Sequence, residues 1–416
     1  MHGRRRRVAD DRARQRRQER AVCPNAHAGL GGGILANATS LAAAASVSLA
    51  VTRLRLTDFR NYRTLALDLD PVPIVATGAN GAGKTNLLEA VSFLAPGRGL
   101  RQSRLSEIDF QAVATGWAVA ATVESANGPV EIGTGRVAPD EKRIVRIAGK
   151  PMRSQSALAE YVSAVWLTPQ MDRLFVEGPA GRRRFLDRLA YGFDTAHAGR
   201  VSAYESAMRQ RSKLLRDGAG DAVWLGVLES TMAERGVAIA AARREIAGRL
   251  NRACALAESP FPKASLQLDG ALEVWLESLP ALEVEERMRA SLAEARRQEA
   301  ENARAPVGPH RSDLLVRHVD KDQAAELCST GEQKALLISI VLADARLRAA
   351  ERNAAPLLLL DEVAAHLDQR RREALFDEID NLHAQVWLTG TDVSTFESLR
   401  DRAQFLHVQE GAAQLI

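Results

Sequence analysis

The stretch GANGAGKT, from Gly78 to Thr85, constrains the fold more than any other, because it matches the complete P-loop pattern G-x-x-x-x-G-K-[ST]. An apolar segment, PVPIVATG, precedes it and NLLEAVSFL follows, which predicts a strand, a loop and a helix in that order. The context disfavours the alternative of a chance glycine-rich turn. The predicted nucleotide contacts are Gly78, Ala79, Asn80, Gly81, Ala82, Gly83, Lys84, Thr85 and Asn86. Lys84 would neutralise the β- and γ-phosphates, and the Thr85 hydroxyl would bind Mg²⁺.

A second motif ends in two adjacent acids, in the sequence LLLLDE from Leu357 to Glu362. Four leucines predict a fully buried parallel strand, and acids at its end would lie beside the P-loop in a doubly wound sheet. Asp361 is the expected Mg²⁺ ligand through water, and Glu362 would polarise the attacking water, with Lys84 as its catalytic companion. The alternative, a capping Asp followed by an acid in a helical first turn, is disfavoured beside a P-loop.

A third motif starts a helix, in CSTGEQKALLISIVLADARL from Cys328 to Leu347. Ser329 and Glu332 form a capping-box pattern, so an ordinary capped helix is one interpretation. Gly331 weakens a helix by about 1 kcal/mol relative to Ala, which favours a close approach of an anion instead. Together with the other two motifs, this Ser-x-Gly turn resembles the ABC class of ATPases. That resemblance implies ATP sandwiched in a homodimer, with Ser329 and Gly331 of one subunit closing over the γ-phosphate held by the other.

Four further stretches resemble the RecF family of SMC-like ATPases in gap repair: DFRNY (58–62), TPQMDRLFVEGPAGRRRFLD (168–187), GPHRSDL (308–314) and STGEQKALL (329–337). The resemblance extends over essentially all of residues 51–416. The resemblance implies that Arg60 and Asn61 approach the nucleotide, that Gln170 is the Q-loop residue facing Mg²⁺, and that Asp368 is the D-loop acid. One departure is that WLTGTD lacks the usual switch histidine, so Thr389 or Asp392 would stand in and slow ATP hydrolysis is expected.

The resemblance also implies a biological role. ATP-driven dimerisation would clamp duplex DNA beside single-strand gaps, and hydrolysis would release it. RecR and RecO would be partners in loading the recombinase onto single-stranded DNA, which links the protein to recombination, replication-fork maintenance and the SOS response. Two rival functions carry less weight. A transporter subunit usually has the sequence L-S-G-G-Q where this chain has C-S-T-G-E, and an ATPase fused to a nuclease would need a further acidic metal-binding domain.

Local clusters of arginine are the best candidates for DNA contacts, because Lys and Arg on phosphates give sequence-independent binding. The candidates are Arg182, Arg183, Arg184, Arg98, Arg101 and Arg104. A solvated helix face with internal ion pairs is the alternative for 182–184. No motif that reads bases is visible.

Net charge is a poor guide here, since residues 1–20 carry nine arginines and three acids, and the rest of the chain is slightly acidic. Residues 1–50 are interpreted as a disordered or spurious extension, although a basic region before a small apolar run also resembles a secretory signal. No apolar run is long enough to span a membrane. Three scattered cysteines fit a reducing cytoplasm.

The order of expected elements defines the fold class. We expect an α/β fold, an ABC-type (SMC-like) ATPase head with a P-loop and a β meander at 112–149, split by a mainly helical second lobe. The predicted boundaries are 51–178 for the N-terminal part of the ATPase lobe, 179–302 for the helical insertion and 303–416 for the C-terminal part of the ATPase lobe.

Overall fold

Short strands form a central sheet in the order β15-β14-β3-β13-β12-β8. The computed structural model describes residues 49–416 apart from 111–115, 141, 219–220 and 303. From β14 to β8 neighbouring strands are parallel, and β15 runs antiparallel to β14. All residues of β3, β8, β12 and β13 are buried, which explains their largely apolar sequences. The strands are β3 (Ile74–Thr77), β8 (Ala164–Leu167), β12 (Leu357–Leu360), β13 (Val386–Gly390), β14 (Gln404–Gln409) and β15 (Ala412–Leu415).

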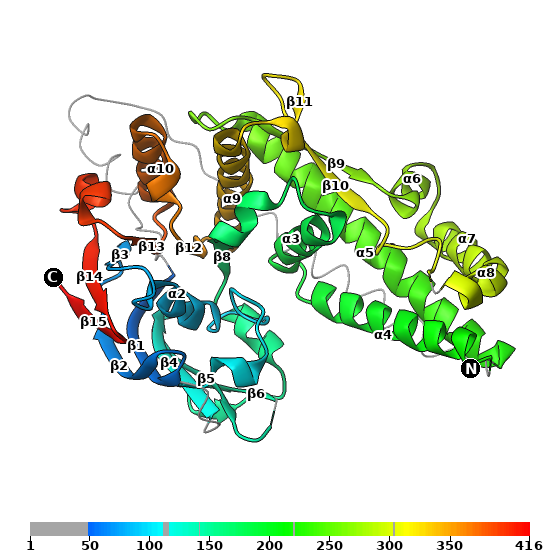
Figure 1. Cartoon of the computed structure of the whole chain (residues 1–416), viewed down its shortest axis with the longest axis horizontal. Helices are drawn as coiled ribbons and strands as arrows, with labels where there is room; N and C mark the ends of the chain where they lie inside the picture. Colours follow the sequence, from blue (N-terminus) through cyan, green and yellow to red (C-terminus); the bar gives the residue numbers. More distant parts are fainter. Residues whose placement is uncertain (1–48, 111–115, 141, 219–220, 303) are drawn as a thin grey trace, which may run out of the picture. The chain divides into compact units, whose positions relative to one another are not determined.

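The parallel arrangement brings two of the sequence motifs to one edge of this sheet. Leu360 on β12 pairs with Leu388 on β13, and Leu388 pairs with Val75 on β3. The residues that follow β3 and β12 are the P-loop and Asp361 (Figure 1). The predicted meeting of these motifs is therefore a direct result of strand order.

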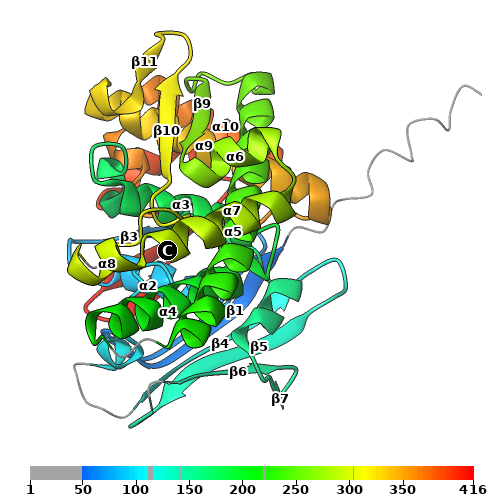
Figure 2. The same ribbon diagram turned by 90° about the vertical axis from the view of Figure 1, so that its right-hand side faces the viewer.

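A second sheet is antiparallel, in the order β2-β1-β4-β5-β6-β7 (Figure 2). It confirms the expected β meander from Gly116 onward. The apolar and polar residues of VTRLRLTDFRNYRTLALDL alternate, which is typical of strands at a sheet edge, but β1 lies between β2 and β4 and only β2 is at the edge. Alternating apolar residues report one buried face and say nothing of pairing partners. The strands are β1 (Ala50–Phe59), β2 (Tyr62–Asp68), β4 (Gly116–Glu124), β5 (Val130–Val137), β6 (Arg143–Ile147) and β7 (Lys150–Pro151).

Aromatic packing joins this second sheet to the segment after the P-loop. The rings of Phe59, Phe93 and Trp117 lie 5.0–6.1 Å apart between centroids. Phe93 caps helix α2 (Lys84–Ser92), which begins in the P-loop. The other helices of this region are α9 (Thr330–Arg352) and α10 (Gln369–Leu382), with short 3-10 segments η1 (Leu105–Ile108), η3 (Gln155–Glu160), η4 (Pro169–Arg173), η5 (Ala325–Leu327), η6 (Ala364–His366) and η7 (Val393–Leu399). Helix α2 is therefore connected to the P-loop at its N-terminus and packed against the second sheet at its C-terminus.

Helices dominate the segment between the two parts of the central sheet. They are α3 (Pro179–Tyr191), α4 (His197–Arg216), α5 (Ala222–Leu256), α6 (Ala271–Ser278), α7 (Ala281–Glu294) and α8 (Arg296–Asn302). A small antiparallel sheet accompanies them, in the order β11-β10-β9, from β9 (Ala264–Asp269), β10 (Asp313–His318) and β11 (Gln323–Ala324). The segment GPHRSDLLVRHV lies in the predicted C-terminal part of the ATPase lobe, yet its strand β10 pairs with β9 and not with the central sheet.

The predicted boundaries meet the structure only in part. The described residues, from 49 onward, belong to one unit by their internal contacts, and a division of that unit at residues 178 and 302 stays a prediction. The interpretation of residues 1–50 as an extension falls outside the described residues, except for buried Leu49 and Ala50. Every helix in the described part of the chain is too short or too polar to cross a lipid bilayer.

Candidate nucleotide-binding site

Glycines shape the P-loop between β3 and α2. Gly78, Gly81 and Gly83 have φ values of 151°, 83° and 118°, which residues with side chains rarely adopt. A Cβ atom on Gly78 would lie 2.1 Å from the carbonyl oxygen of Val408, and one on Gly83 would lie 2.4 Å from Nδ2 of Asn61. Glycine is therefore the residue that fits at both ends of the loop.

Lys84 begins α2, and its side chain folds back over the loop. Its Nζ donates hydrogen bonds of 2.8 and 2.9 Å to the carbonyl oxygens of Gly78 and Ala79. Burial lowers the pKa of Lys84, against the attraction of Glu362 and Asp361. A cation at a helix N-terminus inside a glycine loop is an arrangement that favours a phosphate group.

The carboxylate of Asp361 is buried at the end of β12 and faces the P-loop threonine. Thr85 Oγ1 lies 3.0 and 2.9 Å from its two oxygens, and Thr389 Oγ1 donates to Oδ1 at 2.7 Å. Burial raises the pKa of Asp361, while the hydrogen bonds from Thr389 and Thr85 oppose the rise. A hydroxyl and a carboxylate in contact at the loop are two oxygen ligands of the kind that Mg²⁺ uses beside phosphates.

Glu362 follows Asp361 in a left-handed backbone conformation, with φ at 54°. Its backbone N–H donates a 2.8 Å hydrogen bond to Thr389 Oγ1. Thr389 is fully buried and so holds both acids from the adjacent strand. Asp392, the other residue expected to replace the switch histidine, instead accepts a hydrogen bond from the Ser394 N–H and caps η7. Of the two, Thr389 is the one in contact with the acid pair.

The β1–β2 turn reaches the P-loop through Asn61. Its Nδ2 donates to the carbonyl oxygen of Ala82 at 2.9 Å, and its Oδ1 accepts from Asn86 Nδ2 at 2.7 Å. The Tyr62 hydroxyl donates to the carbonyl oxygen of Gly83 at 3.1 Å. The turn therefore braces the loop from outside, and direct contact of Asn61 with a nucleotide stays a prediction.

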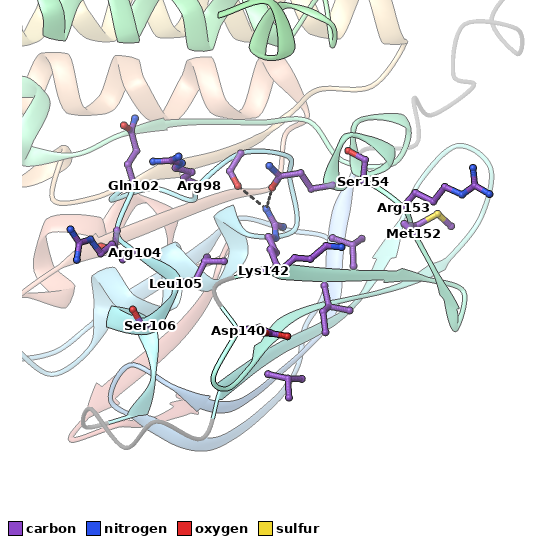
Figure 3. Close-up of a pocket in the computed structure, with 17 residues that line it drawn as sticks. Arg98, Gln102, Arg104, Leu105, Ser106, Asp140, Lys142, Met152, Arg153 and Ser154 are labelled. Carbon is purple, nitrogen blue, oxygen red and sulfur yellow. Dashed lines mark hydrogen bonds between the residues drawn. The ribbon is translucent and has the colours of Figure 1, made fainter. Parts of the chain in front are cut away.

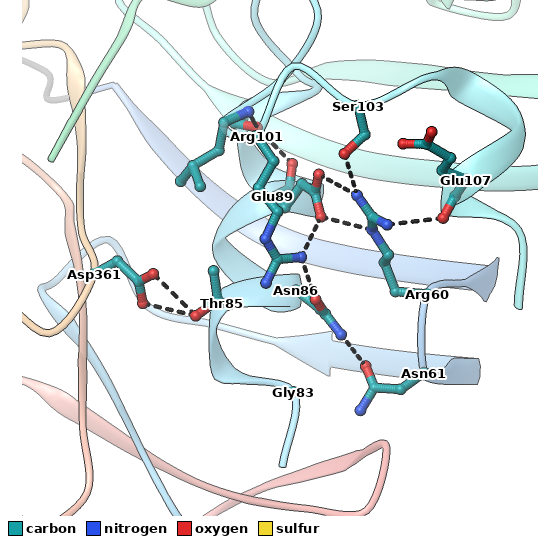
Figure 4. Close-up of polar contacts among 12 residues, drawn as sticks. Arg60, Asn61, Gly83, Thr85, Asn86, Glu89, Arg101, Ser103, Glu107 and Asp361 are labelled. Carbon is teal, nitrogen blue, oxygen red and sulfur yellow. Dashed lines mark hydrogen bonds and ion pairs between the residues drawn. The ribbon is translucent and has the colours of Figure 1, made fainter. Parts of the chain in front are cut away.

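A buried carboxylate, Glu89 on α2, holds two arginines (Figure 4). Arg60 and Arg101 each approach Glu89 to 2.8 Å, and the Glu89 side chain is fully buried. Arg60 also donates to Ser103 Oγ, and Arg101 donates to Asn86 Oδ1. Arg60 therefore forms an ion pair with α2. A contact between Arg60 and a nucleotide stays a prediction. Arg101, predicted to contact DNA, contacts the P-loop helix instead. Its positive charge also acts to lower the pKa of Asp361.

Sequence reasoning missed Glu89. The signal in the sequence is a lone acid within the otherwise apolar run NLLEAVSFL, one helical turn after Thr85. A charge that is buried in this way needs partners, and two of the arginines already singled out supply them.

Gln170 lies in η4, after β8, and is exposed. It lines a cavity of about 290 Å³ together with Arg101 and Arg184. In the same turn, Asp172 pairs with Lys334 of α9 at 3.3 Å. The Q-loop segment is therefore tied to the helix that begins at Ser329, while the role of Gln170 toward Mg²⁺ stays a prediction.

The α9 N-terminus carries the expected capping box. The backbone N–H and the hydroxyl of Ser329 each lie 2.9 Å from Glu332 Oε2. Hydrogen bonds from Lys321 and then Ser329 lower the pKa of Glu332 to about 2. Ser329 and Gly331 are exposed, and apart from the adjoining residues and the backbone of α9 itself no described atom lies within 4 Å of the position that a Cβ atom on Gly331 would take. This helix start is open to an incoming group.

Asp368 is the N-cap of α10. Its carboxylate accepts a 2.8 Å hydrogen bond from the Arg371 N–H, and the residue is exposed. The capping role accounts for an Asp here without a partner subunit. Its predicted D-loop role stays a prediction.

The arginines predicted to contact DNA differ in burial and in their contacts within the fold. Arg182 is buried and binds Asp313 at 2.8 and 2.7 Å, so its guanidinium is engaged within the fold. Arg183 donates to the carbonyl oxygen of Ser312, while Arg184 is exposed. The motifs EGPAGRRRFLD and GPHRSDL thus contact each other, and packing explains much of the arginine run. Arg98 and Arg104 are exposed on a different surface.

The described residues contain no group of three or more His, Cys, Asp or Glu that could hold a metal alone. A cation here would depend on Thr85, Asp361, water and phosphate oxygens, as is usual for Mg²⁺ in nucleotide sites. The glycine loop, Lys84 and this pair of oxygen ligands together fit a nucleoside triphosphate with Mg²⁺.

Comparison with known proteins decides the family. The chain is 50% identical to the DNA replication and repair protein RecF of Rhizobium meliloti over 365 residues, which are 87% of this chain and 97% of the relative. It is 50% identical to that of Mesorhizobium japonicum over 368 residues, 87% of this chain and 96% of the relative. The family model for the RecF/RecN/SMC N terminal domain matches residues 50–414. The chain belongs to the RecF family. The resemblance in the four motifs is confirmed, and the transporter alternative has no support.

Solved structures agree on the fold. The chain matches one described as the recombination mediator protein RecF-ATPrS and one described as RecF-ATP, both in the RecFOR pathway. Each has a TM-score of 0.79 at 22% identity and covers 89% of this chain. The shares of those chains that are matched are 99% and 98%. The predicted ABC-type, SMC-like α/β fold is confirmed.

Proposed function

We propose that this protein is an ATP-switched DNA-binding protein of recombinational repair. ATP and Mg²⁺ bind at the P-loop, ATP drives two copies together, and the dimer clamps duplex DNA beside single-strand gaps. The observation that carries the proposal is a site built in two halves. The P-loop and Asp361 form one half within the chain, and Ser329 with Gly331 form an open helix start that the same chain leaves exposed.

The second half is prepared for an anion. The N-terminus of α9 carries a partial positive charge, and Gly331 lets a phosphate approach the backbone closely. In the single chain, Glu332 accepts the hydrogen bonds of Ser329. A γ-phosphate from a second copy would take the place of that carboxylate, since both are anionic acceptors. Lys321, which also binds Glu332, would keep the displaced carboxylate away from the phosphate.

Hydrolysis is proposed to be slow and to serve release. Glu362 would polarise the attacking water, and Lys84 would neutralise charge on the phosphates. Gln170 and Asp361 would face Mg²⁺, and Asp368 would lie at the contact between the two copies. With Thr389 in place of a switch histidine, a buried hydroxyl positions Asp361 and the backbone of Glu362.

Family membership supports the partners. The relatives are named for DNA replication and repair, and the matched structures for the RecFOR pathway. We therefore propose RecR and RecO as partners, gapped and single-stranded DNA as the setting, a link to the SOS response and a cytoplasmic location. Arg184, Arg98 and Arg104 remain proposed DNA contacts. Arg182 and Arg183 are not proposed, because their guanidinium groups are engaged within the fold.

Analytical sedimentation tests the switch. Glu362→Gln should trap a dimer with ATP and Mg²⁺, because binding is kept while hydrolysis is lost. Glu277→Gln, at an exposed position on α6, is the matched control and should behave as wild type. A Glu362→Gln protein that stays monomeric at saturating ATP and Mg²⁺ would refute the mechanism.

A further inference from the structure

An open cavity of about 970 Å³ lies on the second sheet, beside the segment that follows α2. The described residues that line it come from three parts of the chain: 97–106, 137–140 with 142–145 around the start of β6, and 152–155 (Figure 3). Neither the P-loop nor the α9 helix start contributes to it. It is therefore a separate feature from the nucleotide site.

The charge of this cavity is strongly positive. Four exposed cationic residues line it: Arg98, Arg104, Lys142 and Arg153. Among the described residues that line it, Asp140 is the acid. Within the part of the chain that the structure describes, no carboxylate forms an ion pair with any of the four. Four cations left without acidic partners around a hollow surface attract a polyanion.

The cavity is held in shape by a fifth cation, Arg143, which is not free to bind a ligand. Its guanidinium donates to the carbonyl oxygen of Gly97 at 2.7 Å, to Gln155 Oε1 at 2.9 Å and to Thr134 Oγ1 at 2.7 Å. It also lies 5.1 Å from the centroid of the Phe93 ring. All three lining segments are thereby linked, so a ligand would meet a surface that is already formed.

We propose that this cavity binds the phosphate backbone of duplex DNA, through Arg98, Arg104, Lys142 and Arg153. Arg98 and Arg104 belong to the first segment, Lys142 to the second and Arg153 to the third, so cations from all three segments lie around the hollow (Figure 3). Recognition is by charge, because contacts to phosphates carry no base information. This inference rests on the proposed function and gives the clamp a gripping surface that includes Lys142 and Arg153, which the sequence motifs did not indicate.

The salt dependence of duplex binding reports how many phosphates the protein contacts. Full-length Arg104→Ala/Lys142→Ala protein, with ATP and Mg²⁺, is titrated against a fluorescent duplex at several salt concentrations. Each lost phosphate contact lowers the slope of log affinity against log salt by about 0.9, so the double variant should lose about 2 in slope. The same relation predicts binding on the order of fiftyfold weaker at about 0.1 M salt.

A matched control distinguishes loss of this site from the loss of any two positive charges on the protein surface. Arg252→Ala/Arg289→Ala removes two exposed arginines, on α5 and α7, and should keep the wild-type slope. All variants should still dimerise with ATP, because none of the four residues touches the P-loop. Wild type that fails to bind duplex at all would refute the proposed function.

Two results would overturn the cavity proposal alone. One is wild-type slope and affinity in the Arg104→Ala/Lys142→Ala variant. The other is binding of poly-glutamate as tightly as duplex with the same sensitivity to the two substitutions, which would identify an acidic protein segment as the ligand.

Discussion

The hydroxyl of Thr389 donates a 2.7 Å hydrogen bond to Oδ1 of Asp361, from the strand next to β12 in the central sheet. The hydroxyl oxygen of Thr389 in turn accepts a hydrogen bond of 2.8 Å from the backbone N–H of Glu362. One buried hydroxyl therefore fixes the carboxylate expected at Mg²⁺ and the backbone of the residue expected to activate water. Thr389 is one of the two residues predicted to replace the switch histidine, and that correspondence stays a prediction.

Thr389→Val should slow ATP hydrolysis by at least about tenfold. The substitution keeps the shape of the side chain but leaves the Glu362 N–H without its acceptor, and an unsatisfied buried donor costs about 1–3 kcal/mol. Thr389→Ser should restore most of the rate, because it restores the hydroxyl. Single-turnover hydrolysis measures both variants, and an unchanged rate in the Val variant would show that the hydroxyl does not position the acids.

Ser329→Arg should leave ATP binding to the single chain intact and block ATP-dependent dimerisation. The arginine would fill the open start of α9, which takes part in none of the P-loop hydrogen bonds described above, so the affinity for a fluorescent ATP analogue should stay within about threefold of wild type. Ser278→Arg, at an exposed serine that ends α6, is the control for added bulk and charge. Loss of ATP affinity in the Ser329 variant alone would contradict the assignment of this serine to the partner's site.

The nucleotide site was accessible from the sequence because its parts are short and local. The glycines, Lys84 and Thr85 are adjacent in the chain, and four leucines before Asp361 indicate a buried parallel strand whose end lies at the same sheet edge. The Thr389 contact and the Glu89 cluster depend on how separate segments pack. A strand's neighbours and a buried charge's partners are set by tertiary structure, which residue periodicity does not report.

The arginine run at 182–184 shows the same limit. Three consecutive arginines on a helix are compatible with a DNA surface and with a solvated helix face that has internal ion pairs, but α3 directs them to different surroundings. Arg182 meets Asp313 from a segment 131 residues later in the chain. This partner is known only from the three-dimensional structure. Because Arg182 is bound within the fold, the residues around the basic cavity are better candidates for DNA contacts.

Arg182→Met should destabilise the protein by about 3–5 kcal/mol, because it leaves the largely buried Asp313 carboxylate without its bidentate partner. Arg184→Ala is the control on the same helix and should change the unfolding free energy by less than about 0.5 kcal/mol. Urea unfolding measures both. The salt dependence of duplex binding should be unchanged in folded Arg182→Met protein, and a reduced slope would return this residue to the DNA interface.

His310 should make the protein less stable as the pH falls below about 6.5. Burial lowers its pKa to about 4, with Arg311, Arg183 and Arg243 adding to the effect against a hydrogen bond to the Ala305 carbonyl oxygen. The unfolded chain, with an ordinary histidine pKa, therefore binds a proton that the folded chain does not bind between pH 6.5 and 4. Stability is lost with acidification across that window, by about 2 kcal/mol between pH 6.5 and 4.5.

His310→Asn should remove this part of the pH dependence, since an amide does not titrate and can still reach the Tyr204 hydroxyl, which lies 2.7 Å from Nδ1 of the histidine. Urea unfolding at pH 7.0 and 5.0 gives the difference for each protein, and subtraction of the variant from wild type cancels the other titrating groups. Exposed His383, changed to Asn, is the control and should leave the wild-type difference unaltered. Equal pH dependence in wild type and His310→Asn would mean that this imidazole accepts its proton in the folded chain as readily as in the unfolded one.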